Sequence, residues 1–298
     1  GGTFVDCTFG GGGYSKAILK FPNTKVIAFD RDNNVIETAK EFKKKFKNRF
    51  QFYQSRFSQI DKILKNNIDV IIFDLGLSSI QLNNLKRGFS FKSKDTLDMR
   101  MGLSDFSLKD AINNLSQEQL NLIIKILGEE EEASIISKNI IKARSEKKIT
   151  RVDELVKIIE KSKRKNLSKK INPSTKTFQA LRIFVNKEIS ELITGIINAT
   201  KLLKPGGKII TISFHSIEDK IIKFFFKNYS KNKSKPSRYL PEEKNENLAL
   251  FEKYTNKVVK PSFDEIIINK PSYIRTRRSN VRTFQGCCIQ IINITITT

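Results

Sequence analysis

Near-continuous apolar runs, separated by helix-length stretches, constrain the fold of this chain more than any other feature. Each run ends in polar residues, as strands of a parallel sheet do when helices cover both faces. The runs are Gly2–Thr8, Lys25–Asp30, Phe50–Gln54, Ile68–Gly76 and Lys208–Phe214, and Cys287–Ile296 reads as a final edge strand. The stretch Asn33–Phe46 is long enough for a connecting helix. This order predicts an α/β fold with a doubly wound, mainly parallel sheet and a ligand crevice at the carboxyl ends of its strands.

The alternation of strands and helices stops after Gly76. Three signatures of a helix start follow, in which Ser or Thr precedes an acidic residue or Gln by three positions. These pairs are Ser107 with Asp110, Ser116 with Gln119, and Thr150 with Asp153. We therefore predict a small helical domain, residues 102–172, inserted into a core of residues 1–101 and 173–298.

A second amphipathic pattern follows this insertion. Apolar residues from Leu181 to Leu203 recur every three or four positions, which predicts one long helix that ends at Pro205-Gly206-Gly207. The charged segment Lys231–Lys253 is expected to be a mobile loop.

The charge of the chain favours a polyanionic partner. Fifty-five Lys and Arg against 31 Asp and Glu give a formal net charge of +24. Neutralising phosphates and releasing their counterions supplies much of the affinity of proteins for nucleic acids. Most of the excess is lysine, accompanied by abundant Ile and Asn, so an AT-biased coding sequence is an alternative cause.

The cysteines and apolar runs favour a cytoplasmic protein. Cys7, Cys287 and Cys288 form neither a disulfide framework nor a CxxC metal motif. We also expect no membrane span, because no apolar run reaches about 18 residues. The chain opens with Gly1-Gly2 and no Met, so we expect the natural N-terminus to be missing.

A glycine-rich loop lies between the first strand and the first helix. The stretch DCTFGGGGYS, Asp6–Ser15, contains four consecutive glycines, which let a backbone approach a ligand closely and adopt positive φ. Asp30 ends the second strand, where a carboxylate can accept hydrogen bonds from both ribose hydroxyls. Together they indicate a nucleotide-type cofactor, although glycines that only permit tight packing are an alternative.

The acidic residue before the loop discriminates between cofactors. Asp6 would repel the pyrophosphate of NAD but suits the amino group or sulfonium of S-adenosylmethionine. A nicotinamide oxidoreductase is therefore disfavoured, and no constellation for hydride transfer accompanies the loop.

Five motifs together resemble one family in order and spacing. They are DCTFGGGGYS, DLGLSSIQL (Asp74–Leu82), RGFSFKSKDTLDMRM (Arg87–Met101), NPSTKTFQALRIFVNKE (Asn172–Glu188) and GGKIITISFHSIEDK (Gly206–Lys220). The chain is similar to the bacterial 16S rRNA cytosine-N4 methyltransferases, the RsmH (MraW) family. This resemblance implies the Rossmann-like fold of class I S-adenosylmethionine-dependent methyltransferases, with an inserted helical domain.

The resemblance also implies a set of cofactor contacts. They fall on Gly12, Gly13, Tyr14, Asp30, Phe57, Asp74 and Gln81. Phe57 would form an apolar wall for adenine, and Asp74 with Gln81 would close the rim. Tyr14 departs from the usual histidine of the family; a backbone contact would survive this change, but a role for the imidazole would not. Ile80, Asn83 and Asn172 replace the usual Pro, Asp and His, which bears on substrate affinity.

The expected chemistry requires alignment of a weak nucleophile. A cytosine N4 amine is conjugated with its ring, so it needs in-line placement and a partner for its N–H proton. From their location after the fourth strand, Asp74 and Ser78 are the candidates to hold the amine. His215, the single histidine, follows the fifth strand and is a candidate proton relay, with a structural role as the alternative. Without further His or clustered Cys, we expect no metal.

Candidate substrate contacts lie in three places. Both methionines flank Arg100 in TLDMRM, Thr96–Met101, where they would form either a pliable wall or ordinary core packing. The other candidates are Arg182 and Asn186, four residues apart on one helix, and the basic run Arg275, Arg277, Arg278 and Arg282. This run would contact phosphates, or else form a solvated loop.

These expectations lead to one preferred function and one alternative. The resemblance implies S-adenosylmethionine-dependent methylation of the N4 amine of a cytidine at the family's decoding-centre position in 16S rRNA. A base in folded RNA must be unstacked to be modified, so an assembled or partly assembled small ribosomal subunit is the expected partner. The alternative is a catalytically silent RNA-binding ribosome assembly factor, which the change at Tyr14 keeps open.

Overall fold

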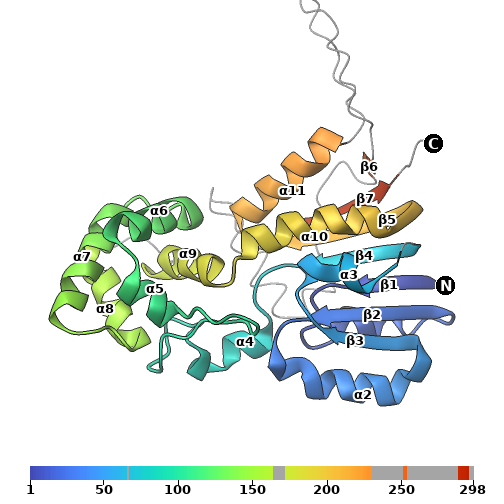
Figure 1. Ribbon diagram of the computed structural model, residues 1–298, viewed down its shortest axis with the longest axis horizontal. Coiled ribbons are helices and arrows are strands. Elements are labelled where there is room, and N and C mark those ends of the chain that lie inside the picture. Colours follow the sequence, from blue (N-terminus) through green and yellow to red (C-terminus); the bar gives the residue numbers. More distant parts are fainter. Residues whose placement is uncertain (66, 164–171, 230–250, 254–287, 295–298) are drawn as a thin grey trace, which may run out of the picture. The chain divides into compact units, whose positions relative to one another are not determined.

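The computed structural model describes residues 1–65, 67–163, 172–229, 251–253 and 288–294 (Figure 1). These residues belong to two compact units. The sheet unit comprises Gly1–Asp30, Val35–Gly76 and Glu191–Thr298. The helical unit comprises Arg31–Asn34 and Leu77–Ser190. In the described part of the chain, no helix combines the length and apolar character needed to cross a membrane.

The sheet unit confirms the predicted doubly wound, mainly parallel sheet. Its strands follow the order β3-β2-β1-β4-β5-β7-β6, with β3 to β5 parallel and β7 antiparallel to both of its neighbours. The strands are β1 (Gly2–Asp6), β2 (Thr24–Asp30), β3 (Phe50–Gln54), β4 (Ile68–Asp74), β5 (Leu203–Ser213), β6 (Phe251–Lys253) and β7 (Cys288–Ile294). The four N-terminal runs therefore form the strands that their apolar character predicted.

The C-terminal strands differ from the prediction in one respect. β7 was expected at the edge of the sheet, but β6 pairs with its outer side. Three residues of the segment that was expected to be a loop therefore form a strand, because an unpaired strand edge offers main-chain groups to any extended segment that reaches it.

Helices cover both faces of the sheet (Figure 1). One apolar cluster joins Phe29 and Phe73 to α3, α10 and α11, and a second joins Val26 and Ala28 to α1 and α2. Neighbouring residues of β2 enter different clusters because successive side chains of a strand point to opposite faces. The helical segments are α1 (Gly13–Ile18), η1 (Asn33–Val35), α2 (Ile36–Phe46), η2 (Lys47–Arg49), η3 (Phe57–Gln59), α3 (Ile60–Ile63), α10 (Glu188–Leu202) and α11 (Ser216–Tyr229).

The long helix predicted from Leu181 to Leu203 is wrong, since two helices occupy this range. α9 (Thr175–Val185) ends before Lys187, whose φ of 52° lies in the left-handed region, and α10 begins at the next residue. Apolar residues recur every three or four positions on both sides of the break, because each helix buries one face. Pro205-Gly206-Gly207 also does not end the helix: α10 ends at Leu202, and the three residues lie within β5 where its register with β4 shifts.

The helical unit contains the predicted helix starts, with one shift. Ser107 and Ser116 each accept a hydrogen bond from the main-chain N–H three residues later, at 3.2 Å. Before α8, however, Glu154 accepts from Arg151, so the capping pair lies one residue beyond the predicted pair of Thr150 and Asp153. The helices are α4 (Ser79–Asn83), η4 (Leu85–Arg87), α5 (Leu108–Asn114), α6 (Gln117–Gly128), α7 (Ala133–Glu146), α8 (Val152–Ser162) and α9.

The helical unit extends beyond the predicted range of residues 102–172 at both ends. Its apolar core includes Met99 and Met101 before that range, and Phe178 and Leu181 after it. Both methionines of TLDMRM are therefore core residues, with at most 4% of their surface exposed. Burial of these flanking segments, rather than the helix-start signatures, sets the limits of the unit.

Candidate functional site

The glycine-rich loop turns sharply between β1 and α1. Gly12 has a φ of 74°, and a Cβ atom there would lie 2.6 Å from Cζ of Phe42. A side chain at this position would therefore be strained by both backbone and packing. Nothing lies within 4 Å of the corresponding position at Gly13, and Tyr14 is 39% exposed in the first turn of α1. Gly12 thus shapes the loop, while Gly13 leaves space beside it.

Asp30 ties the loop to the end of β2. Its Oδ2 atom accepts a hydrogen bond of 2.8 Å from the main-chain N–H of Gly10. The sequence predicted both parts of this arrangement but not the bond between them. A carboxylate is thereby held beside a close-approach loop, at the carboxyl edge of a parallel sheet where doubly wound proteins bind ligands.

Asp6, the last residue of β1, is fully buried and directly precedes the same loop. Its carboxylate accepts hydrogen bonds from the Ser15 hydroxyl at 2.7 Å and from the Thr8 N–H at 3.2 Å. Burial raises the pKa of Asp6 to about 6, and the nearby Asp30 charge adds to this effect, while the hydrogen bonds from Ser15 and Thr8 oppose it. Asp6 therefore holds the start of α1 against the loop, at an energetic cost when it is ionised.

Replacing Asp6 by asparagine should remove a pH dependence of stability. Between about pH 4 and pH 6 the folded carboxyl retains a proton that the unfolded chain has lost, so folding is favoured at the acidic end. The free energy of unfolding of the wild type, relative to that of Asp6→Asn, should fall by about 3 kcal/mol as the pH rises through this window and then level off. Urea denaturation of both proteins across this range measures the difference, and a constant difference would contradict the prediction.

Asp74 joins the end of β4 to the same loop. Its main-chain N–H donates a hydrogen bond of 2.8 Å to the Thr8 hydroxyl. The ends of β1, β2 and β4 are thus linked to one another through the residues that follow β1. This places three carboxylates, those of Asp6, Asp30 and Asp74, at neighbouring strand ends of the sheet unit.

Phe57, the predicted adenine wall, lies in η3 after β3. Its ring packs edge-on against Phe73, with centroids 5.5 Å apart. A Cβ atom at Gly195 of α10 would lie 2.6 Å from Cδ2 of this ring, so glycine makes room for it. Phe57 is held by the core from two sides while remaining partly exposed.

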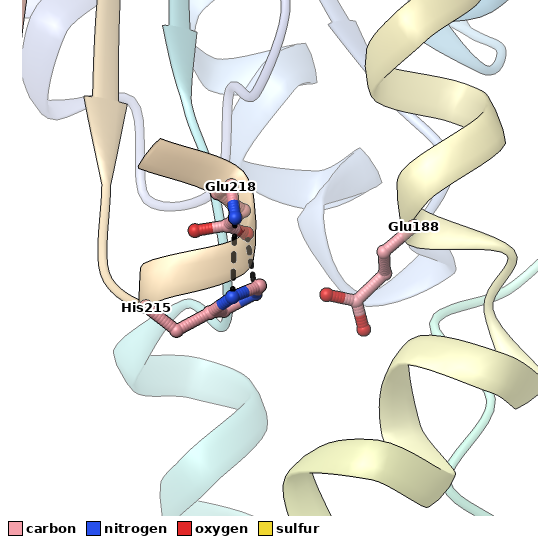
Figure 2. A group of neighbouring side chains, drawn as sticks. All are labelled: Glu188, His215 and Glu218. Carbon is pink, nitrogen blue, oxygen red and sulfur yellow. Dashed lines mark hydrogen bonds and ion pairs between the residues drawn. The ribbon is translucent and has the colours of Figure 1, made fainter. Parts of the chain in front are cut away.

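His215 lies at the start of α11, where it interacts with Glu218 (Figure 2). The Glu218 N–H donates to Nδ1 at 3.4 Å, and Nε2 lies 3.0 Å from a Glu218 carboxylate oxygen. The other carboxylate oxygen accepts from the Phe214 N–H at 3.0 Å. Both His215 and Glu218 are buried. These contacts support the structural alternative for His215, and the sequence analysis missed Glu218 although it lies in the same motif.

Two predicted site residues cap a helix of the helical unit. The Ser78 hydroxyl accepts from the Gln81 N–H at 3.2 Å, and the Gln81 side chain accepts from the Ser78 N–H at 3.0 Å. Gln81 also donates to Asp32 at 2.7 Å. The Gln81 side chain therefore has hydrogen-bond partners within the helical unit itself. The cofactor contact that the resemblance implies for Gln81 would be additional to them.

The predicted substrate contacts also have partners within the helical unit. Arg100 pairs with Asp98, and Arg182 forms two hydrogen bonds of 2.8 Å with Glu188. Asn186 is buried and bonds the main chain of Met99 and Met101, each at 2.8 Å. Asn186 therefore supports the core segment TLDMRM. The predicted phosphate contacts Arg275, Arg277, Arg278 and Arg282 lie outside the described residues.

A buried polar network around Asp32 was missed by the sequence analysis. The Asp32 carboxylate accepts from Arg87 at 2.5 Å, from Gln81, and from the Asn34 N–H at 3.0 Å. Arg87 also donates to the carbonyl of Arg100 at 2.7 Å. Two signals were available in the sequence. One is Asp32, the second acidic residue of FDRD just after β2, and the other is Arg87, which opens RGFSF.

The chain is similar to known proteins over most of its length. Residues 1–285 match the model of the MraW methylase family. The chain is similar to "Ribosomal RNA small subunit methyltransferase H" of Ehrlichia canis (strain Jake), with 41% identity over 277 residues, 91% of this chain and 90% of that protein. It is also similar to the protein of the same name from Rickettsia akari (strain Hartford), with 40% identity over 291 residues, 95% of this chain and 92% of that protein. The glycine-rich loop and the carboxylates at the strand ends fit a nucleotide-type cofactor. On the strength of these matches, this chain belongs to the MraW methylase family.

Proposed function

We propose that this chain is an S-adenosylmethionine-dependent methyltransferase that modifies the N4 amine of a cytidine in 16S rRNA of the small ribosomal subunit. The observation that carries the proposal is the hydrogen bond from Gly10 to Asp30, which fixes a carboxylate beside the glycine-rich loop. Membership of the MraW methylase family supports the methyl transfer, and the names of the two relatives support the ribosomal substrate.

Residues of the sheet unit would hold the cofactor. Gly12 and Gly13 allow the backbone to approach it, and Asp30 would accept hydrogen bonds from its ribose hydroxyls. Phe57 would provide an apolar surface for adenine. The carboxylates of Asp6 and Asp74 supply negative charge nearby, which favours a cationic ligand over a pyrophosphate.

The bound cofactor supplies an electrophilic methyl group on a sulfonium. For transfer, the N4 nitrogen forms a bond to the methyl carbon as the bond from that carbon to sulfur breaks, and the amine then loses a proton. Asp74 or Ser78 would accept a hydrogen bond from the amine, which orients its lone pair and stabilises the positive charge that develops. Water can take the released proton, since a methylated, cationic amine is readily deprotonated.

Single-turnover methyl transfer tests this function. We expect the wild type to transfer a labelled methyl group from S-adenosylmethionine to small subunits isolated from cells that lack the protein. At least one of the variants Asp74→Ala and Ser78→Ala should slow this step by about 100-fold, because it removes the acceptor that holds the reacting amine. Unchanged rates for both variants would remove both residues from the reaction. Binding of S-adenosylhomocysteine without any transfer by the wild type would instead favour a silent assembly factor.

A further inference from the structure

The helical unit contains a pocket of about 450 Å³ that the proposed function does not use. Its walls come from three segments: the residues after β2, the turn around η4, and the segment from Asp98 to Ser104. All of these belong to the helical unit. The volume lies within the range of small-molecule sites, and it is far larger than a single ion or water requires.

The charges that line this pocket cancel. Asp32 pairs with Arg87, and Asp98 pairs with Arg100. The lining therefore has no formal net charge, so it favours a neutral polar ligand over a free phosphate or a metal ion. The guanidinium-bearing side chain of Arg100 is 41% exposed, which leaves it accessible to a ligand.

The remaining lining offers hydrogen bonds and an apolar contact. Asn33, Asn34 and Asn84 contribute amide-bearing side chains, and Ser104 contributes a hydroxyl. Leu103, with 48% of its surface exposed, adds an apolar surface. Amide and guanidinium groups can match the donors and acceptors at the edge of a nucleobase, while an apolar side chain can cover its face.

Polar contacts hold the walls in place. Arg87 bonds both the Asp32 carboxylate and the Arg100 carbonyl, so it links two of the lining segments. At Gly102, with a φ of 96°, a Cβ atom would lie only 2.1 Å from the carbonyl oxygen of Arg31. The two main chains therefore meet directly. A site whose walls are fixed before binding loses less entropy when it takes up a ligand.

We propose that this pocket binds an unstacked nucleobase of the RNA substrate. This inference rests on the proposed function, which identifies RNA as the substrate. The lining of the pocket indicates which part of the RNA, a nucleobase, would bind there. Its amides, its exposed arginine and its apolar side chain suit a flat heterocycle, and its balanced charge gives no preference for the phosphate backbone. The adenine of the cofactor has the same chemistry, so the experiment must separate the two sources.

Fluorescence anisotropy with a short single-stranded RNA tests the proposal. The probe is compared with versions in which one abasic ribose occupies each position in turn, so that a base is lost but every phosphate remains. We expect the wild type to bind at least one abasic version about ten-fold more weakly, as for loss of one base contact. Asn34→Trp should fill the pocket, bind the intact RNA about ten-fold more weakly, and lose the discrimination. Arg100→Ala should reduce the discrimination without filling the space.

Asn114→Trp is the matched control, since Asn114 is exposed on the same unit but does not line the pocket. It should bind both RNAs as the wild type does, and circular dichroism should show all variants folded. Wild-type discrimination in both Asn34→Trp and Arg100→Ala overturns the proposal. Loss of affinity for S-adenosylhomocysteine in Asn34→Trp, with RNA discrimination intact, assigns the pocket to the cofactor and also overturns it. If the wild type discriminates but transfers no methyl group, the proposed function fails while the pocket assignment stands.

Discussion

Replacing Asp32 by alanine should destabilise the helical unit by about 3–5 kcal/mol. Asp32 and Arg87 are both largely buried, with side-chain exposures of 3% and 13%. Removing the carboxylate leaves the arginine without its counterion, and it also removes the acceptor for Gln81 and for the Asn34 N–H. An unpaired charge in a protein interior is among the most destabilising changes that one substitution can make. Hydrogen exchange of α5 to α8 in urea measures the loss within this unit.

Asp98→Ala is the matched control in the same unit. Asp98 also pairs with an arginine, but the side chains of this pair are 31% and 41% exposed. Because solvent screens exposed charges, its loss should cost at most about 1 kcal/mol. Equal losses for the two variants would show that burial of the Asp32 network contributes nothing.

Replacing Asp30 by alanine should weaken the binding of S-adenosylhomocysteine by about 100-fold or more. The substitution removes the acceptor of the Gly10 N–H, which holds the loop, and removes the proposed acceptor of the ribose hydroxyls. Hydrogen bonds to a charged group each contribute about 1.5–3 kcal/mol, so two such losses are sufficient for this effect. Isothermal titration calorimetry measures the affinity directly.

Asp61→Ala controls for the loss of one negative charge. Asp61 is an exposed residue of α3 in the same unit, away from the glycine-rich loop in sequence. It should bind S-adenosylhomocysteine as tightly as the wild type does. Wild-type affinity in Asp30→Ala would contradict the role proposed for the end of β2.

The central part of the fold could be predicted from the sequence because its signals are local. The runs that became β2 and β4 carry apolar residues on both faces, as buried parallel strands require. The serines before α5 and α6 satisfy main-chain N–H groups within three residues. Gly12 needs positive φ, which the quadruple-glycine run accommodates.

Other features depend on contacts between residues far apart in the chain, so no local pattern indicated them. The break at Lys187 follows Asn186, whose amide bonds a segment more than 80 residues earlier in the sequence. β6 forms only where β7 provides a partner. Asp32 gains its partners Gln81 and Arg87 only through the folding of the helical unit.

The candidate site divides in the same way. The placement of Asp30, Asp74 and the glycine-rich loop at one edge of the sheet could be predicted, because strand ends and glycine runs are visible in a sequence. The partners of Arg182 and His215 could not, although both partners lie within six residues, because a short spacing does not reveal which acidic side chain turns toward a cation. The arginines Arg275 to Arg282 remain a prediction from sequence.

Mass spectrometry of nucleosides from small-subunit RNA tests the proposed reaction most directly. RNA is isolated from cells that lack the protein and from the same cells after they regain either the full-length wild type or its Asp30→Ala variant. We predict that one N4-methylated cytidine in 16S rRNA is absent from the deficient cells, returns with the wild type and does not return with the variant. An identical set of modified nucleosides in all three samples would contradict the assignment of this chain as the cytidine methyltransferase.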